Sequence, residues 1–139
     1  MAEPQIKANA KCKAICPHFV VPDVVASSEH YRDVLGFKIL GYWLDPPAFA
    51  IVARDDVEIH LGKSDHGALP SPNIVRRESG LDAYIWVNDV DAMYEELRGR
   101  GAKILEPPTL TVYKCYELLV EDNFGFRLCF SMDCSLQKP

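Results

Sequence analysis

The feature that most constrains this chain is a phrase that occurs twice. The first copy runs from Asp23–Ala26 (DVVA) through a short amphipathic segment to Gly36–Leu40 (GFKIL). The second runs from Asp89–Ala92 (DVDA) through a similar segment to Gly101–Leu105 (GAKIL). Each copy follows a run of residues typical of a β-strand. A repeated phrase of strand, helix, glycine and strand predicts two copies of one supersecondary unit.

The bulk composition sets limits on partners and location. The 139 residues suffice for one domain or two small modules that share a core. The net charge is -5 and no basic cluster occurs, so we expect no nucleic-acid partner. The sequence holds no apolar run of about 18 residues and no apolar signal core, which predicts a cytoplasmic protein without membrane contact. The five scattered cysteines are expected to be reduced thiols.

The first half predicts one strand, one helix and three further strands. Ser27 or Ser28 is expected to cap the helix, which continues to about Leu35 and stops at Gly36. The expected strands cover residues 15–21, 37–43, 49–53 and 57–61, separated by turns at 45–47 and 54–56.

The second half repeats this order. Asp89 or Asp91 is expected to open a helix to about Arg98, and the expected strands cover residues 81–87, 102–105, 115–120 and 126–131, with Pro107-Pro108 ending the second of them. The predicted fold class is α+β, with two βαβββ modules in tandem whose curled mixed sheets form a cleft. The expected division is an N-terminal tail (1–13), a first module (14–65), a linker (66–80), a second module (81–133) and a C-terminal tail (134–139).

Residue alternation separates two faces on each predicted sheet. In four strands one face is apolar and suited to cover by a helix, because strand side chains alternate in direction. The other face mixes polar and aromatic side chains; it holds His18, Glu58, His60, Asp82, Tyr84, Trp86, Arg127 and Cys129. This mixture favours a ligand cleft. A solvated sheet face, or one covered by another subunit, is the alternative.

The repeated phrase resembles the first-helix signature of the vicinal oxygen chelate superfamily, which includes glyoxalase I, extradiol dioxygenases and bleomycin-resistance proteins. The matching residues are Asp23-Val24, Ser27 and Tyr31–Phe37, with Tyr84–Ala92 in the second half, and Asp122–Gly125 is similar to the family's Asp-Pro-Asp-Gly turn. The resemblance spans residues 14–132. It implies paired βαβββ modules around a cleft that is often completed in a homodimer.

The resemblance also implies where metal ligands stand in members that use one. The matching first-strand positions hold Cys16 and Asp82. The fourth-strand position falls on Glu58, or on His60 if the register differs by two residues. The last position is Cys129, where a metal enzyme has glutamate. Because this set departs from the usual histidines and glutamates, no metal ion and no cofactor is expected; a divalent metal ion is the alternative.

The sequence is more similar to the metal-free, bleomycin-resistance-like branch. We therefore expect a metal-independent protein that binds a small molecule in an aromatic and charged cleft. The expected ligand-binding residues are His18, Trp43, Glu58, His60, Asp82, Tyr84, Trp86, Arg127 and Cys129. Arg127 suits an anionic group and Glu58 a cationic one, although these two residues can instead pair with each other.

Whether the protein is an enzyme stays open at this point. The alternative function is a metal-dependent lyase, isomerase or dioxygenase in which Glu58 or His60 acts as a base or metal ligand. Covalent chemistry through Cys16 or Cys129 is a weaker hypothesis.

Overall fold

The computed structural model describes residues 5–133 and contains two modules with the same element order. The first module comprises β1 (His18–Val21), α1 (Val24–Asp33), β2 (Lys38–Trp43), β3 (Phe49–Arg54) and β4 (Val57–Lys63). The second comprises β5 (Ala83–Trp86), α2 (Val90–Gly99), β6 (Lys103–Leu110), β7 (Cys115–Glu121) and β8 (Arg127–Asp133). Two short 3-10 turns, η1 (Asp65–Gly67) and η2 (Asn73–Val75), lie in the connection between them.

Each module is a four-stranded mixed sheet with one helix. The strand orders are β1-β4-β3-β2 and β5-β8-β7-β6. In both sheets the first strand of the module pairs in parallel with the last, and the other neighbours are antiparallel. The predicted α+β fold with two βαβββ modules is therefore confirmed.

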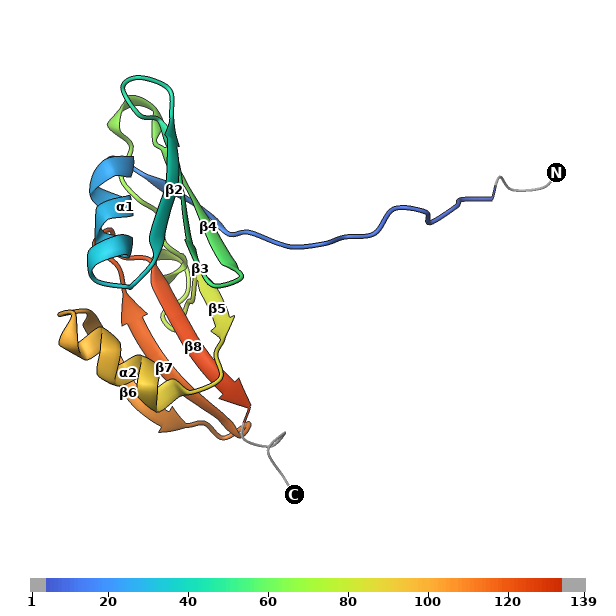
Figure 1. Cartoon of the computed structure of the whole chain (residues 1–139). Coiled ribbons are helices and arrows are strands. Elements are labelled where there is room, and N and C mark those ends of the chain that lie inside the picture. Colours follow the sequence, from blue (N-terminus) through green and yellow to red (C-terminus); the bar gives the residue numbers. More distant parts are fainter. Residues whose placement is uncertain (1–4, 134–139) are drawn as a thin grey trace.

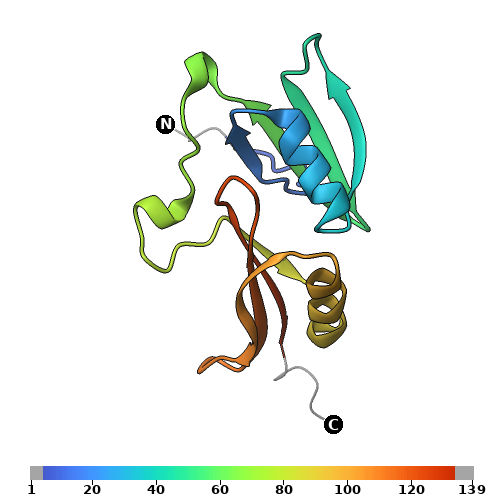
Figure 2. The ribbon, with the colours of Figure 1, turned by 90° about the vertical axis from the view of Figure 1, so that its left-hand side faces the viewer.

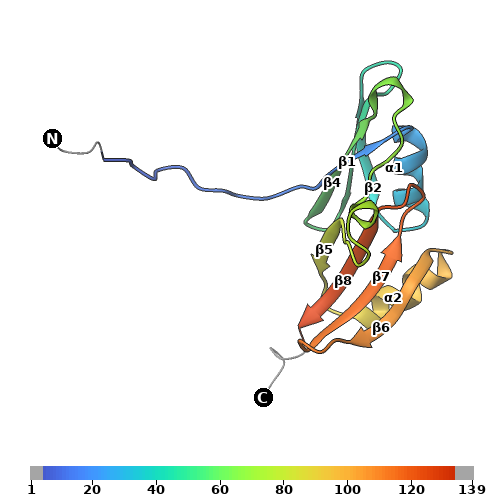
Figure 3. The same cartoon turned by 180° about the vertical axis from the view of Figure 1, so that it is seen from behind.

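Both helices lie on the same side of the molecule, and the N-terminal segment leaves on the opposite side (Figure 1). The connection with the two 3-10 turns runs along the flank away from the helices (Figure 2). Seen from behind, both helices again lie on one side of the molecule, at the right of the view, and the N-terminal segment leaves toward the left (Figure 3). The apolar strand positions are buried against this side, among them Val21, Ile59, Leu61, Leu118 and Leu128. Neither α1 nor α2 lies over the opposite sheet face, here called the open face (Figures 1 and 3).

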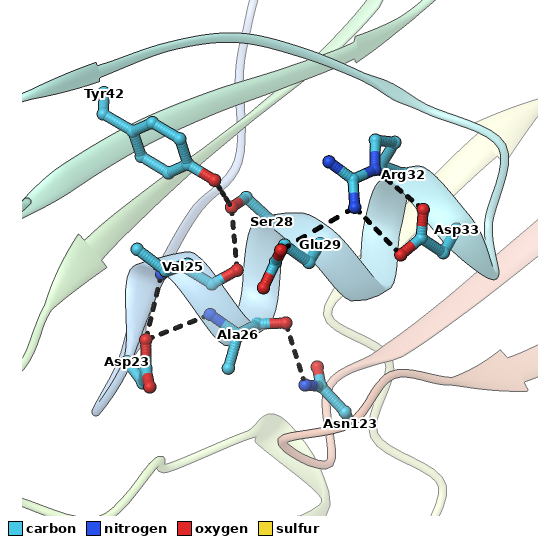
Figure 4. Close-up of polar contacts among 9 residues, drawn as sticks. All are labelled: Asp23, Val25, Ala26, Ser28, Glu29, Arg32, Asp33, Tyr42 and Asn123. Atoms are coloured by element: carbon cyan, nitrogen blue, oxygen red, sulfur yellow. Dashed lines mark hydrogen bonds and ion pairs between the residues drawn. The ribbon is translucent and has the colours of Figure 1, made fainter.

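Helix α1 begins earlier than predicted. Asp23 is its N-cap, because one carboxylate oxygen accepts from the backbone N–H groups of Val25 and Ala26 at 3.0 Å each (Figure 4). The predicted capping by Ser27 or Ser28 is wrong, since both serines are buried inside the helix. The N-cap of helix α2 is Asp89, one of the two residues predicted to open this helix.

The predicted end of a strand at Pro107-Pro108 is also wrong. β6 continues through both prolines to Leu110. β6 is an edge strand, with a partner strand on one side only. A proline in such a strand has no backbone N–H, but it removes no hydrogen bond from the sheet where its nitrogen faces the unpaired side. Its register with β7 shifts twice near the prolines, between Ile104 and Thr109. These irregularities accommodate the prolines within the strand.

Several other boundaries move by a few residues. The first and fifth strands begin at His18 and Ala83, later than predicted, and residues 5–17 form neither helix nor strand. Gly36, predicted to end the first helix, and Gly101, its counterpart in the repeated phrase, have φ values of 77° and 83°, which an L side chain rarely adopts. The predicted tails extend into residues 1–4 and 134–139, which lie outside the described residues, as does Cys134.

No helix in the described part of the chain is long and apolar enough to span a membrane.

Contacts between β1, α1 and the β7–β8 turn hold the modules together. The rings of Phe19 and Phe126 stack at 4.5 Å with an interplanar angle of 4°. The side chain of Asn123, in the turn, donates to the backbone carbonyl of Ala26 at 3.2 Å (Figure 4). These contacts join the first strand and the helix of the first module to the turn between the last two strands of the second.

Candidate functional site

The open face of the first module gathers aromatic and histidine side chains around Phe49. Parallel pairing of β1 and β4 sets His18 directly opposite His60. The ring of Phe49 stacks on His18 at 5.7 Å and meets His60 edge-on at 5.5 Å. Trp43 approaches the same ring at 5.6 Å. Three predicted ligand-binding residues therefore share one aromatic surface. Its central residue, Phe49, was not predicted, although strand alternation in 49–53 would have found it.

A thiol, a carboxylate and an imidazole meet beside this surface. Nε2 of His60 lies 2.8 Å from Oε1 of Glu58. Cys16 stands just before β1, and the potential ligand atoms of Cys16, Glu58 and His60 all lie within 4.8 Å of one another. All three side chains are half-buried. Among the described residues, this is the one group of three or more such side chains close enough to share a metal ion.

A groove of about 600 Å³ lies where the two modules meet. Cys16 and Glu58 line it from the first module, and Asp82, Tyr84 and Trp86 line it from the second. The rings of Tyr84 and Trp86 lie 5.2 Å apart, and Trp86 is 60% exposed. The groove therefore brings together four of the residues predicted to bind a ligand: Glu58, Asp82, Tyr84 and Trp86.

The carboxylate of Asp82 is already occupied by the backbone. One oxygen accepts from the N–H of Asn73 in the connecting segment, and the other from the N–H of Arg127 at the start of β8, both at 2.8 Å. Asp82 therefore ties the connection to the second sheet. Its charge still lies at the groove wall, but its oxygens are committed to these donors.

Tyr84 belongs to a second polar cluster, on the open face of the second module. Its hydroxyl donates to the carboxylate of Glu117 and lies 2.8 Å from the hydroxyl of Ser131. The hydroxyl of Tyr113 donates to Glu117 at 2.9 Å. Burial and then the bond to Glu117 raise the pKa of Tyr84, so the phenol stays protonated. Glu117 was not predicted; its place between Cys115 and Leu119 on an alternating strand is the signal that identifies it.

Cys129 faces this second cluster and is only 2% exposed. Burial, followed by the negative charge of Glu117, raises the pKa of Cys129 to about 12. The residue is therefore a neutral thiol at ordinary pH, which weighs against the hypothesis of covalent chemistry at this position. A separate cavity of about 290 Å³ adjoins Cys129, Glu117 and Tyr113.

Arg127 pairs within its own sheet. Its Nε lies 3.5 Å from a carboxylate oxygen of Glu121, the residue opposite it on β7. The expected alternative pairing with Glu58 is therefore replaced by a cross-strand pair with Glu121. Arg127 is not among the residues that line the groove between the modules.

The strand register shows which residue of the fourth strand, Glu58 or His60, corresponds to Cys129 in the second module, a question that the sequence left open. His18 lies opposite His60 in the first sheet, and Tyr84, its counterpart in the repeat, lies opposite Cys129 in the second. His60 is therefore the structural counterpart of Cys129. Of the positions that the family resemblance implied, those of the first module converge, whereas Asp82 bonds to the backbone and Cys129 faces Glu117.

Comparison with protein families agrees with this architecture. Residues 15–130 match the model of the glyoxalase/bleomycin resistance protein/dioxygenase superfamily. The chain belongs to this superfamily, as the resemblance of the repeated phrase predicted. Among curated proteins, no sequence matches the chain.

Solved structures share the fold at low sequence identity. A bleomycin-binding protein from Streptomyces verticillus, solved with copper(II)-bleomycin, is 24% identical; the match covers 87% of this chain and 96% of that one, with a TM-score of 0.66. A bleomycin resistance determinant encoded on transposon Tn5 is 17% identical over 88% of this chain and 99% of that one, with a TM-score of 0.70. TioX from Micromonospora sp. ML1 is 17% identical with the same coverage and a TM-score of 0.68.

Proposed function

We propose that this protein binds a small molecule in the groove between its modules, and that binding does not require a metal ion. The observation that carries the proposal is the groove itself, in which acidic side chains of both modules meet the aromatic side chains Tyr84 and Trp86 of the second. Its volume of about 600 Å³ falls within the range of small-molecule sites. A bleomycin-binding protein and a bleomycin resistance determinant of the same fold support a binding role.

The chemistry of the groove favours a planar ligand with a positive charge. Trp86 offers an exposed ring for stacking. Asp56, Glu58 and Asp82 supply carboxylates, and none of the described residues that line the groove is Lys or Arg. A ligand cation near these acids gains Coulomb energy in a partly desolvated site. Arg127 does not line the groove, and its Nε lies 3.5 Å from Glu121, a carboxylate that also pairs with Lys103 at 3.0 Å; this position argues against a role for Arg127 in holding an anion in the groove.

We also propose a homodimer that covers part of the open face. Large apolar side chains are partly exposed there, including Val20 at 46%, Trp43 at 46% and Trp86 at 60%. Exposed apolar surface of this kind is typical of an interaction site. Sedimentation of the full chain at several concentrations tests this; a monomer throughout would contradict it.

Trp86 fluorescence tests ligand binding. In a Trp43→Phe background Trp86 is the single tryptophan, and we expect the planar cation proflavine and copper(II)-bleomycin to quench it more strongly than the anion anilinonaphthalene sulfonate. Calorimetry gives the Kd of proflavine in the presence of a chelator. Glu58→Gln should weaken proflavine binding about tenfold, whereas Glu95→Gln, on the exposed side of α2, should leave it unchanged. Absence of quenching, or equal effects of the two variants, would contradict the proposal.

A metal-dependent lyase, isomerase or dioxygenase reaction is the second candidate function. The hydrogen bond between His60 and Glu58 favours it, because such a pair can hold and transfer a proton in the groove. Turnover of a superfamily substrate that requires an added divalent ion, and that disappears in both Glu58→Gln and His60→Gln, would support this function over simple binding.

A further inference from the structure

We propose that Cys12 and Cys16 form a reversible disulfide that closes the N-terminal arm, residues 5–16, over the edge of the groove. The bond is a redox switch for the ligand site: it forms with an oxidant and opens with a reductant. The reduced thiols expected from the sequence are the open state. The effect on the ligand rests on the proposed function, whereas the bond and the movement of the arm do not.

The arm is not held in its extended shape. Residues 5–15 are exposed, and the arm leaves the body on the side away from the helices (Figures 1 and 3). Within the described part of the chain, no hydrogen bond or ion pair holds residues 5–16. The first tie is the backbone carbonyl of Pro17, which accepts from the N–H of His60 at 3.0 Å. A bend before Pro17 therefore breaks no hydrogen bond.

The arm also carries the two accessible thiols among the described residues. Cys12 is exposed and Cys16 is half-buried, whereas Cys115 and Cys129 are only 9% and 2% exposed. An oxidant in solution therefore meets Cys12 first. Cys16 follows four residues later and is the thiol placed to attack a bond formed at Cys12.

A single turn of the chain brings the two cysteines to bonding distance. A disulfide requires Cα atoms about 4.4–6.8 Å apart. Four residues of extended chain span roughly 13–14 Å, but four residues of a helical turn rise only about 6 Å. The intervening residues, Lys13, Ala14 and Ile15, include no glycine or proline that would resist such a turn.

The charges of the arm and the groove favour closure. Ile15 and Cys16 already line the groove. Residues 5–17 hold three lysines and no acidic residue, whereas the described residues that line the groove include three carboxylates and no Lys or Arg. A turn that joins the cysteines draws Lys11 and Lys13 toward these carboxylates, and opposite charges attract. The closed arm therefore offsets the negative charge that the proposed cationic ligand needs.

The oxidant is a small disulfide of the glutathione type. The thiolate of Cys12 attacks one of its sulfur atoms, a mixed disulfide forms, and the other half leaves as a thiol. The thiolate of Cys16 then attacks the sulfur of Cys12, and the second half leaves as a thiol. The protein thiols lose two electrons and two protons, which the small disulfide gains as two thiols. A reducing dithiol such as dithiothreitol reverses both steps.

Mass spectrometry of the full chain carrying Cys134→Ser tests the bond. After incubation with glutathione disulfide, we expect a monomer that is lighter by two hydrogen atoms and carries no glutathione. Trypsin should release two peptides that remain joined through Cys12 and Cys16. A disulfide-linked dimer, a mixed disulfide that persists, or the absence of oxidation would overturn the proposal.

Single variants in the same background identify the partners. Cys16→Ser should keep one glutathione on Cys12, and Cys12→Ser should form no bond within the chain. Cys115→Ser is the matched control: it removes a buried thiol and should close the arm as readily as the parent. Circular dichroism of each variant checks that the fold is intact. Loss of the bond in Cys115→Ser would contradict the assignment.

The effect on the groove is measured first without a ligand. Trp86 lines the same groove as Ile15, is 60% exposed, and becomes the single tryptophan in Trp43→Phe. Acrylamide should quench its fluorescence less in the oxidised protein, and dithiothreitol should restore the quenching. Neither reagent should change the quenching in Cys12→Ser. A closed bond with unchanged quenching would overturn the switch.

Proflavine then reports the charge of the closed arm. Oxidation should weaken its binding roughly two- to threefold, because lysines lie near the carboxylates of the groove. Lys13→Gln should reduce this weakening, whereas Lys7→Gln, farther along the arm, should not. The mass and quenching measurements decide the switch even where proflavine binds neither form, a result that would contradict only the proposed function.

Discussion

The hydroxyl of Tyr31 on α1 donates a 2.7 Å hydrogen bond to the carboxylate of Asp122 in the turn between β7 and β8. Tyr31 is fully buried and Asp122 is 4% exposed. Asp122 also accepts from the backbone N–H groups of Phe124 and Phe126, which shape the turn. A residue from the helix of one module thus meets the turn of the other, and two of the segments that carried the family resemblance are in contact.

Loss of this contact should destabilise the protein. We expect Tyr31→Phe to lower the free energy of unfolding by about 1–3 kcal/mol, because a buried carboxylate loses one of its donors. Urea unfolding followed by circular dichroism measures the change. Tyr42→Phe is the control: its hydroxyl contacts Ser28 within the first module, Tyr42 is 39% exposed, and its loss should cost less. Equal losses would contradict a special role for Tyr31.

Tyr31 should also make stability fall at alkaline pH. Burial, and next the charge of Asp122, raise the pKa of Tyr31 well above its ordinary value of 10.0. A raised folded-state pKa gives stability that is fully present below the unfolded pKa and is lost as the pH rises above it. Unfolding free energies measured from about pH 8 to about pH 11 should therefore decline. The decline should be shallower in Tyr31→Phe, and an unchanged slope would contradict this assignment.

An ion pair between the modules gives a third prediction. Arg54 donates to both carboxylate oxygens of Glu96 at 2.8 and 2.7 Å. Because Glu96 is 35% exposed, we expect Glu96→Gln to cost only about 1 kcal/mol. Glu95→Gln, whose partner Arg98 is largely exposed on the same helix, should change stability by less than about 0.5 kcal/mol. Denaturant midpoints of the two variants test the difference.

The Glu96 effect should also depend on acid pH. Hydrogen bonding from Arg54, the largest cause, lowers the pKa of Glu96. A lowered folded-state pKa gives stability that is present above the ordinary value of 4.5 and is lost as the pH falls. The difference between Glu96→Gln and the unchanged protein should therefore shrink on acidification. A difference that grows would contradict the ion pair.

Cys129 should resist alkylation in the folded protein. With its pKa raised to about 12 from 9.0, its thiolate fraction at neutral pH is roughly a thousandfold below the ordinary value. Cys12 is exposed and should react first with iodoacetamide. Mass spectrometry of peptides from a Cys134→Ser variant follows both sites over time. Modification of Cys129 at the same rate as Cys12 would contradict the burial of Cys129 in the folded protein.

Much of the fold was predictable because its signals are local. Strand alternation placed His18 and His60 on the open face and Phe19 and Ile59 in the core, and burial confirms this. The errors came from competing local signals. Ser28 suits a helix cap but Asp23 stands earlier and captures the first N–H groups, and Pro107 suits a strand end but lies on an edge strand.

The candidate site was predictable only as a set of side chains on one face. The contacts that these side chains make depend on pairings between segments far apart in the chain. Asp82 meets the N–H of Arg127, a contact across 45 residues, and Arg127 takes Glu121 instead of Glu58. Glu117 was not predicted, because its role in the site depends on hydrogen bonds from Tyr84 and Tyr113, which lie in other parts of the module.

The sequence by itself determined the duplicated βαβββ order and the face to which each strand residue points, since chain geometry sets both over a few residues. Only the tertiary structure decided which open-face residues meet. Parallel pairing of β1 with β4 brings Cys16 to Glu58 and His60, while the matching position Asp82 is taken by backbone donors. Strand register depends on packing between distant segments, and so two copies of one phrase acquire different chemistry.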